Sequence, residues 1–394
     1  MTKKSRFIFV SESVTEGHPD KLCDQISDAL VDRFVSEDPH ARVDAECAVS
    51  NGVLFLSARF NSTAHVDVTA SARQSIARIG YEKDELDADS CTILTTLAES
   101  TAPRGSDMSE VDMDDEELDS VVATEHANVF GYACDQAPSL LPAPIELAHQ
   151  LSRRIDEVRR DASLPYLGAD CKAQVAVEYV DREPARIHSV SLVVTGDPEG
   201  VASGKALNRD VREWIVDPFL EGCPIPKDKR TRIFINPGAA LVPGGPRLHS
   251  GLTGRKNAVD TYGEYARHSG AALSGKDLLR IDRIGAYGAR YAAKNVVAAG
   301  LAKQCEVALS YTIGQASPVG IDVDTFATGK VPDEEIGQRL RGVMDFRVAG
   351  ILKDLRLREA VAAGSGSFFR RLAVYGHMGR LDLGLPWEDI STCD

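Results

Sequence analysis

The sequence predicts an α/β (α+β) fold made of three similar units, each combining a mixed sheet with helices. Strand–turn–strand patterns at 42–60, 173–194 and 305–326 begin about 130 residues apart in a chain of 394, and regular spacing of this length indicates an internal repeat. A helical pattern precedes each of these hairpins and another follows it. Because the same order occurs three times, we prefer a repeat to a chance succession of common elements.

The first hairpin has the clearest signal, because Asn51 and Gly52 form a pair that favours a tight turn between two strand-like runs. Apolar residues at helical spacing predict the flanking helices. The helices expected before the hairpins cover 18–35, 144–160 and 284–303. Those expected after the hairpins cover 67–79, 205–217 and 333–345.

These patterns divide the chain into an N-terminal unit (6–104), a central unit (127–242) and a C-terminal unit (243–390). Residues 105–126 fit none of the units, because the run SDMSEVDMDDEELDS is strongly acidic and has little to bury. The default interpretation of such a run is a mobile, solvated loop. The alternative is a lid over an active site, since surface loops often carry functional residues.

Composition excludes several classes of protein. The formal charge of −14 argues against nucleic acid as a partner. We find no signal peptide and no apolar run as long as a membrane span. The eight cysteines are scattered without metal spacing, which is typical of reduced thiols. We therefore expect a cytoplasmic protein that binds neither nucleic acid nor a membrane.

The stretch SESVTEGHPDKLCDQ begins the first predicted helix with unusual chemistry. Pro19 suits the first helical position, and Asp20 in the first turn suits the helix dipole. A structural role would explain one aspartate. It does not explain why His18 and Lys21 stand at the same helix start.

The segment 251–283 is rich in glycine and in cations that bind phosphate oxygens. The cations are Arg255, Lys256, Lys276 and Arg280. Asp277 and Asp282 lie among them, and an acid in such a cluster often holds Mg²⁺. The alternative is a surface of mutual ion pairs. The spacing is not that of a Walker A loop, so the pattern predicts a polyphosphate site with metal of another kind.

These motifs resemble those of the S-adenosylmethionine synthetase (methionine adenosyltransferase) family. The resemblance runs in order from about residue 7 to 390 through SESVTEGHPDK, FINP, GLTGRK, VDTYG, SGKD, SYTIG, KVPDE and YGHMGR. It implies three similar domains around a pseudo-threefold axis. It also implies a homodimer with sites between the subunits, often paired into a tetramer.

The resemblance further implies a reaction. The family transfers the adenosyl group of ATP to the sulfur of methionine by attack on C5′ of the ribose, and the tripolyphosphate leaves. This product is then cut to phosphate and pyrophosphate. Such an attack needs a fixed nucleophile and neutralisation of the charge that grows on the leaving group. Cations and Mg²⁺ would supply that neutralisation, and the family also uses K⁺.

Matched by position, His18 resembles the histidine beside the bridging oxygen of the bond that breaks. The residues that resemble phosphate-binding or catalytic cations are Lys172, Arg255, Lys256 and Lys276, and Arg280 stands where the family has a lysine. The expected ligands are Asp20 and Asp282 for Mg²⁺ and Glu46 for K⁺. The expected nucleoside contacts are Asp170 for the ribose, Ile313 for the adenine and Leu241 in place of an aromatic ring that stacks on the base.

The expected acceptor pocket departs from the family at three positions: Arg59, Ser100 and His249 replace a glutamate, a glutamine and an aspartate. Each change removes a partner for the ammonium of methionine. Turning attraction into repulsion at 4 Å swings an interaction of roughly 4 kcal/mol at an effective dielectric near 20. We therefore predict an anionic acceptor other than methionine. The alternatives are an ordinary S-adenosylmethionine synthetase and an inactive homologue that binds nucleotide.

Overall fold

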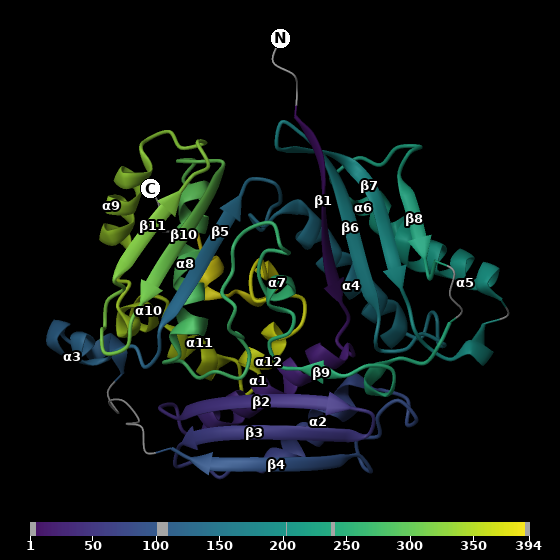
Figure 1. Ribbon diagram of the computed structural model, residues 1–394, viewed down its shortest axis with the longest axis horizontal. Coiled ribbons are helices and arrows are strands. Elements are labelled where there is room, and N and C mark those ends of the chain that lie inside the picture. The colour runs from purple at the N-terminus through teal and green to yellow at the C-terminus, as the bar shows by residue number, and fades with distance from the viewer. Residues whose placement is uncertain (1–4, 101–108, 202, 238–240, 391–394) are drawn as a thin grey trace.

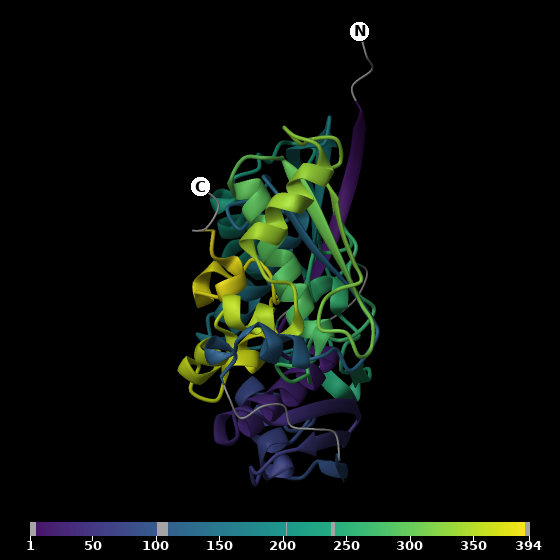
Figure 2. The ribbon, with the colours of Figure 1, turned by 90° about the vertical axis from the view of Figure 1, so that its left-hand side faces the viewer.

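The computed structural model describes residues 5–100, 109–201, 203–237 and 241–390. Three sheets lie at one face of the molecule, with helices behind them (Figure 1). Figure 2 shows the same layering from the side, with the C-terminal helices in yellow on the side away from β1. The mixed α/β architecture of three sheets and helices confirms the predicted fold class.

All three predicted hairpins are present. They are β2 (Arg42–Ser50) with β3 (Val53–Asn61), β6 (Lys172–Val180) with β7 (Glu183–Val193), and β10 (Gln304–Tyr311) with β11 (Gly320–Asp324). Each pair is antiparallel, and β2 is joined to β3 through Asn51, whose φ is 49°. The positive φ explains why asparagine occurs at this turn, because asparagine tolerates the left-handed region.

The predicted helices are also present. Those before the hairpins are α1 (Pro19–Glu37), α4 (Ala143–Arg160) and α8 (Ile281–Ala298). Those after them are α2 (Val68–Ile79), α5 (Gly204–Val211) and α9 (Asp333–Val343), and α5 continues through a π-turn at 212–216 into α6 (Asp217–Gly222). Apolar side chains on these helices bury against the sheets, which is what the helical spacing indicated.

The sheets do not follow the predicted units, because each unit gives its first strand to another sheet. β1 (Arg6–Val14) pairs with β6, β5 (Ala127–Cys134) pairs with β10, and β9 (Gly251–Leu252) pairs with β2. The outer strands β4 (Thr92–Glu99) and β8 (Arg232–Ile235) pair in parallel with β3 and β7. This exchange links the three units into a ring, and the ranges 6–104, 127–242 and 243–390 remain a prediction about domains.

Helix α8 packs closely against strand β5. A Cβ placed on Gly131 would lie 1.9 Å from the carbonyl carbon of Ala289, so only glycine lets the strand approach the helix so closely. The large buried side chains of this region include Tyr287 and Trp387, whose rings stack with centroids 3.8 Å apart. α8 is therefore held on both sides, and the residues at its start are fixed in position.

The acidic segment is folded over the part that the structure describes. Residues 110–112 form a 3₁₀ turn and 115–120 form α3 (Asp115–Ser120). Glu110 is bound by Arg358 on α11 (Leu357–Ala363), and Arg347 at the start of α10 (Val348–Asp354) pairs with Asp115 and Asp119. These contacts differ from the mobile loop expected for 105–126. Residues 105–108 lie outside the described part, and the role as a lid remains a prediction.

The remaining helices are α7 (Asn257–Asp260) and α12 (Phe368–Leu372). Within the described ranges, every helix is too short or too polar to span a lipid bilayer.

Candidate active site

The start of α1 explains part of the HPDK motif. His18 is the N-cap, and its Nδ1 accepts the backbone N–H of Asp20 at 3.2 Å. Burial, together with the charges of Lys172 and Lys256, lowers the pKa of His18 from 6.5 to about 2. A neutral imidazole therefore lies at the helix start, surrounded by cations.

Asp20 lies between the start of α1 and the GLTGRK motif. Its carboxylate accepts the N–H of Leu252 at 3.0 Å and lies 3.5 Å from the guanidinium of Arg255 and 3.4 Å from Nζ of Lys256. The close approach depends on Gly251, where a Cβ would be 2.1 Å from the carbonyl oxygen of Pro19. The turn after β9 thus brings two predicted phosphate-binding cations to a predicted metal ligand.

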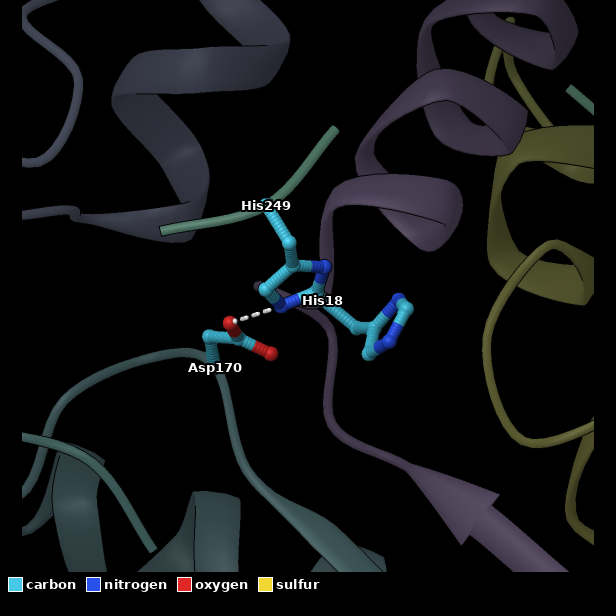
Figure 3. Close-up of side chains that lie close together, drawn as sticks. All are labelled: His18, Asp170 and His249. Carbon is cyan, nitrogen blue, oxygen red and sulfur yellow. Dashed lines mark hydrogen bonds and ion pairs between the residues drawn. The ribbon is translucent and has the colours of Figure 1, made fainter. Parts of the chain in front are cut away.

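Asp170 and His249 meet next to His18 (Figure 3). The Nε2–H of His249 donates to Oδ2 of Asp170 at 2.8 Å, since a carboxylate can only accept. Oδ2 also accepts the N–H of Gly245 at 2.9 Å, whereas the buried Oδ1 has no hydrogen-bond partner among the residues that the structure describes. Lys172 begins β6 two residues beyond Asp170 and has no ion-pair partner among the described side chains. We call this set the α1 group: His18, Asp20, Asp170, Lys172, His249, Arg255 and Lys256.

A second cluster surrounds the start of α8. Nζ of Lys276 lies 2.5 Å from Oδ2 of Asp282. Arg280 is the N-cap residue, and its guanidinium lies 2.5 Å from Glu125 and 3.5 Å from Asp44. We call this set the α8 group: Asp44, Glu125, Lys276, Arg280 and Asp282.

The two groups lie at opposite ends of β2. Lys276 forms a β-bridge with Asp44, whereas β9 pairs with Ala48 and Val49. Val49 lies five positions beyond Asp44 on the strand, which corresponds to roughly 17 Å at about 3.3 Å per residue. The sequence-predicted phosphate and metal residues therefore form two half-sites in one chain and do not form a single cavity.

The three predicted acceptor residues are divided in the same way. Arg59 is exposed and pairs across the strands with Asp44, and the N–H of Ser100 donates to the carbonyl oxygen of Phe60. Both lie at the α8-group end of the sheet, whereas His249 belongs to the α1 group. The structure therefore does not bring Arg59, Ser100 and His249 together within one chain.

The predicted adenine contacts Ile313 and Leu241 differ in how far they are exposed to solvent. Ile313 is 56% exposed and lies in the loop after β10. The N–H of the following residue, Gly314, donates to the carbonyl oxygen of Ala123, so this loop lies beside the segment that carries Glu125 of the α8 group. Leu241 is only 5% exposed and belongs to the core of the central unit. Ile313 is thus free to touch a ligand, whereas the contact of Leu241 with a base remains a prediction.

The buried face of α1 carries a series of aspartates that the sequence analysis did not single out. Asp20, Asp24, Asp28 and Asp32 recur at intervals of four residues, and each accepts a backbone N–H from the C-terminal half of the chain. The signal in the sequence was this spacing, which places all four on one helix face. Lys21, buried between Asp24 and Asp260, partly balances the charge.

The carboxylates suit a hard cation to different degrees. Asp20 and Asp282 are 2% and 6% exposed and lie among cations, which is a fitting environment for Mg²⁺ bound to phosphate oxygens. Asp282 fits only if Lys276 moves off it. Glu46 is exposed on the outer face of β2, and no ion pair joins it to another residue of the described ranges. The described part of one chain therefore does not enclose Glu46 in a K⁺ site.

Each half-site combines carboxylates with cations around the start of a helix. Such a surface binds a polyanion through its cations, while the carboxylates hold a divalent ion that bridges the phosphates. Neutral His18 can donate a hydrogen bond without adding charge. These properties suit the stabilisation of a phosphate leaving group.

Comparison with known proteins identifies the family that the sequence motifs resemble. The family profiles of the S-adenosylmethionine synthetase N-terminal, central and C-terminal domains match residues 6–102, 120–241 and 243–389. A protein named S-adenosylmethionine synthase from Synechococcus sp. (strain JA-3-3Ab) is 44% identical, with 97% of this chain and 95% of the relative aligned. Another of that name, from Rippkaea orientalis (strain PCC 8801 / RF-1), is 43% identical over 97% and 94% of the two chains. The chain therefore belongs to the S-adenosylmethionine synthetase family and is a transferase of the methionine adenosyltransferase type.

Proposed function

We propose that this protein transfers the adenosyl group of ATP to the sulfur of methionine and releases tripolyphosphate, which it then cleaves to phosphate and pyrophosphate. The observation that carries the proposal is the match over nearly the whole chain to relatives named S-adenosylmethionine synthase. The cations Lys172, Arg255, Lys256 and Lys276 lie in the two half-sites, where they would neutralise the leaving group.

The two half-sites support a homodimer as the active form. A twofold axis would place the α1 group of one copy against the α8 group of the other, so that each site takes residues from both chains. The outer faces of two sheets carry exposed apolar side chains that a second copy would cover. These are Ile8 (47% exposed), Val10 (38%), Phe55 (47%), Leu94 (52%) and Leu252 (43%).

We propose that the reaction requires both Mg²⁺ and K⁺. Asp20 and Asp282 would hold Mg²⁺ from the two sides of a completed site, and bound Mg²⁺ supplies neutralisation of the phosphate charge. Glu46 would contribute to K⁺ binding once a second copy covers its face of the sheet. Buried free cysteines, such as Cys23 and Cys171, support the cytoplasm as the compartment. Further pairing of dimers into tetramers remains an expectation from the family.

Methionine is preferred over the anionic acceptor because an aspartate adjoins each of the two residues that suggested an anion. Arg59 lies opposite Asp44, and His249 is hydrogen-bonded to Asp170. The relatives' name also favours methionine. An altered acceptor stays the second candidate, because Arg59 stands where the resembled family has a glutamate.

The test incubates the purified protein with ATP, Mg²⁺, K⁺ and either methionine or its deamino analogue, which keeps the thioether and the carboxylate but lacks the ammonium. We expect S-adenosylmethionine, phosphate and pyrophosphate in the methionine reaction, detected by mass spectrometry and phosphate assay. Turnover only with the deamino analogue would favour the altered acceptor. Failure to consume ATP with either compound would favour the inactive homologue and refute the proposal.

A paired substitution examines the acceptor residues directly. If Arg59 and His249 disfavour methionine, Arg59→Glu combined with His249→Asp should lower KM for methionine by at least tenfold. The exposed substitution Arg339→Glu is the control for a change of charge. An unchanged KM, with ordinary turnover in the parent protein, is the result we expect for an ordinary synthetase.

A further inference from the structure

Three side chains of the α1 group form a cluster of metal-binding type. His18, Asp170 and His249 each offer one ligand atom, and these atoms all lie within 4.8 Å of one another. Figure 3 shows that they come from three segments far apart in the sequence, namely the start of α1, the loop before β6 and the loop before β9. We propose that this cluster binds a divalent transition-metal ion of the Zn²⁺ class, which excludes ATP from the half-site.

The donor set points to this class of ion. Two imidazoles and one carboxylate suit Zn²⁺ or Co²⁺, whereas Mg²⁺ prefers oxygen ligands and keeps several waters. This site is therefore distinct from the Mg²⁺ ligands Asp20 and Asp282. It depends on His249, which stands where the resembled motif has an aspartate, so it belongs to this chain and not to the general reaction.

Two of the three residues carry buried atoms with unused bonding capacity. His18 and Asp170 are 2% and 3% exposed. Nε2 of His18 and Oδ1 of Asp170 have no hydrogen-bond partner in the described part of the chain. A buried polar atom without a partner costs free energy. A metal ion between these residues would bind Oδ1 of Asp170. It would also bind Nε2 of His18 once the proton on Nε2 has moved to Nδ1, a shift that gives up the hydrogen bond from the N–H of Asp20. The second oxygen of Asp170 is already fixed by the N–H of Gly245.

The three side chains are close to a metal-binding geometry, but the His18 ring is not yet oriented to share an ion with the other two. His249 and Asp170 are in contact at 2.8 Å, and the rings of His18 and His249 have centroids 5.0 Å apart. Tetrahedral Zn²⁺ with bonds of about 2.0 Å needs ligand atoms roughly 3.3 Å apart. In Figure 3 the nitrogens of His18 are turned away from Asp170, so closure requires the His18 ring to turn toward the pair.

The protonation states allow binding without a charged ring. His249 carries its proton on Nε2, since that nitrogen donates to Asp170. Coordination through Nε2 moves this proton to Nδ1 of the same ring, and the metal takes the Nε2 lone pair. Lys172 and Lys256 oppose a divalent cation here, while Asp20 and Asp170 favour it. We therefore expect weaker binding than at a structural zinc site.

Only the inhibitory effect rests on the proposed function, and the binding can be measured without ATP. The full-length protein, freed of metal, is titrated with Co²⁺ and with Zn²⁺, and the d–d absorption of Co²⁺ reports nitrogen ligands in a low-coordinate site. His249→Gln keeps a hydrogen-bond donor toward Asp170 but removes the imidazole. His65→Ala is the matched control, because His65 is an exposed histidine outside the cluster.

We expect one Co²⁺ or Zn²⁺ per chain, with the dissociation constant raised about 10- to 100-fold or more in His249→Gln and unchanged in His65→Ala. ATP should compete with the metal, and His249→Gln should keep the parent circular-dichroism spectrum. Equal binding by the parent and His249→Gln would overturn the inference, as would binding that Mg²⁺ displaces equally well. A protein that binds Co²⁺ through His249 but makes no S-adenosylmethionine would refute the proposed function and leave this inference standing.

Discussion

Nζ of Lys276 lies 2.5 Å from Oδ2 of Asp282, so that a predicted phosphate-binding cation and a predicted metal ligand neutralise each other. Both are nearly buried, at 8% and 6% exposure. When a triphosphate and a divalent ion bind, Lys276 can turn to the phosphate and Asp282 to the metal. The ion pair therefore keeps two buried charges satisfied in the free protein.

Replacing Lys276 by methionine should remove a cation from the leaving group while keeping the length of the side chain. We expect kcat for ATP consumption to fall by about 10²- to 10³-fold, the effect of losing one group that stabilises developing negative charge. Steady-state phosphate release measures it. Lys303→Met is the control, because Lys303 forms a surface ion pair with Glu183. Equal rates for the parent and Lys276→Met would contradict the role given to Lys276.

Gly275 positions Lys276 through its backbone. Its φ is +84°, and a Cβ would lie 2.0 Å from the carbonyl oxygen of Ala45. Gly275→Ala should therefore displace the loop from β2 and lower the urea midpoint and the activity together. Gly270→Ala, in the same loop, meets no atom within 4 Å and should leave both unchanged. Similar midpoints for the two variants would show that the loop has more freedom than its contacts imply.

Asp32 should make stability depend on pH. Burial raises the pKa of Asp32 from 3.8 to about 7. Between these values the folded protein holds a proton that the unfolded chain has lost. Asp32 therefore lowers the free energy of unfolding as pH rises from about 4 to 7, by up to about 1.4 kcal/mol per unit. Its contribution becomes constant above that window.

Asp32→Asn should remove this component, because an amide does not titrate. Urea midpoints measured from pH 5 to 8 should fall less steeply with pH in Asp32→Asn than in the parent. The exposed substitution Asp135→Asn should keep the parent slope. If Asp32→Asn and the parent have the same slope, Asp32 is already ionised in the folded protein across this range.

Arg358 should hold the acidic segment against the C-terminal helices. Its guanidinium binds both oxygens of Glu110, whose side chain is 6% exposed. Arg358→Ala leaves this carboxylate buried without its cation, which costs about 3 kcal/mol. We expect faster hydrogen exchange at 110–120, measured by mass spectrometry. Arg339→Ala, which removes only an exposed pair with Glu335, should not change it.

The same variant tests whether the segment acts as a lid. If 109–126 moves during the reaction, KM for ATP should change in Arg358→Ala along with the exchange rate. A change in exchange alone would assign Arg358 a structural role, and the segment would then serve to brace α10 and α11.

The sequence by itself determined the hairpins, most helices and the chemistry of the cluster near residue 250. Asn51-Gly52 and the helical spacing of apolar residues are local signals, because turn geometry and amphipathic burial act over a few residues. The HPDK and GLTGRK motifs likewise predicted which residues would bind phosphate and metal. Their chemistry is carried by the side chains themselves.

Only the tertiary structure decided which residues meet. The exchange of β1, β5 and β9 between sheets and the separation of Lys256 from Lys276 along β2 depend on contacts between segments more than 100 residues apart. The conformational propensities of neighbouring residues do not determine which distant strands pair. The bond between His249 and Asp170 has the same origin, because two loops come together only when β9 joins β2 and β6 joins β1.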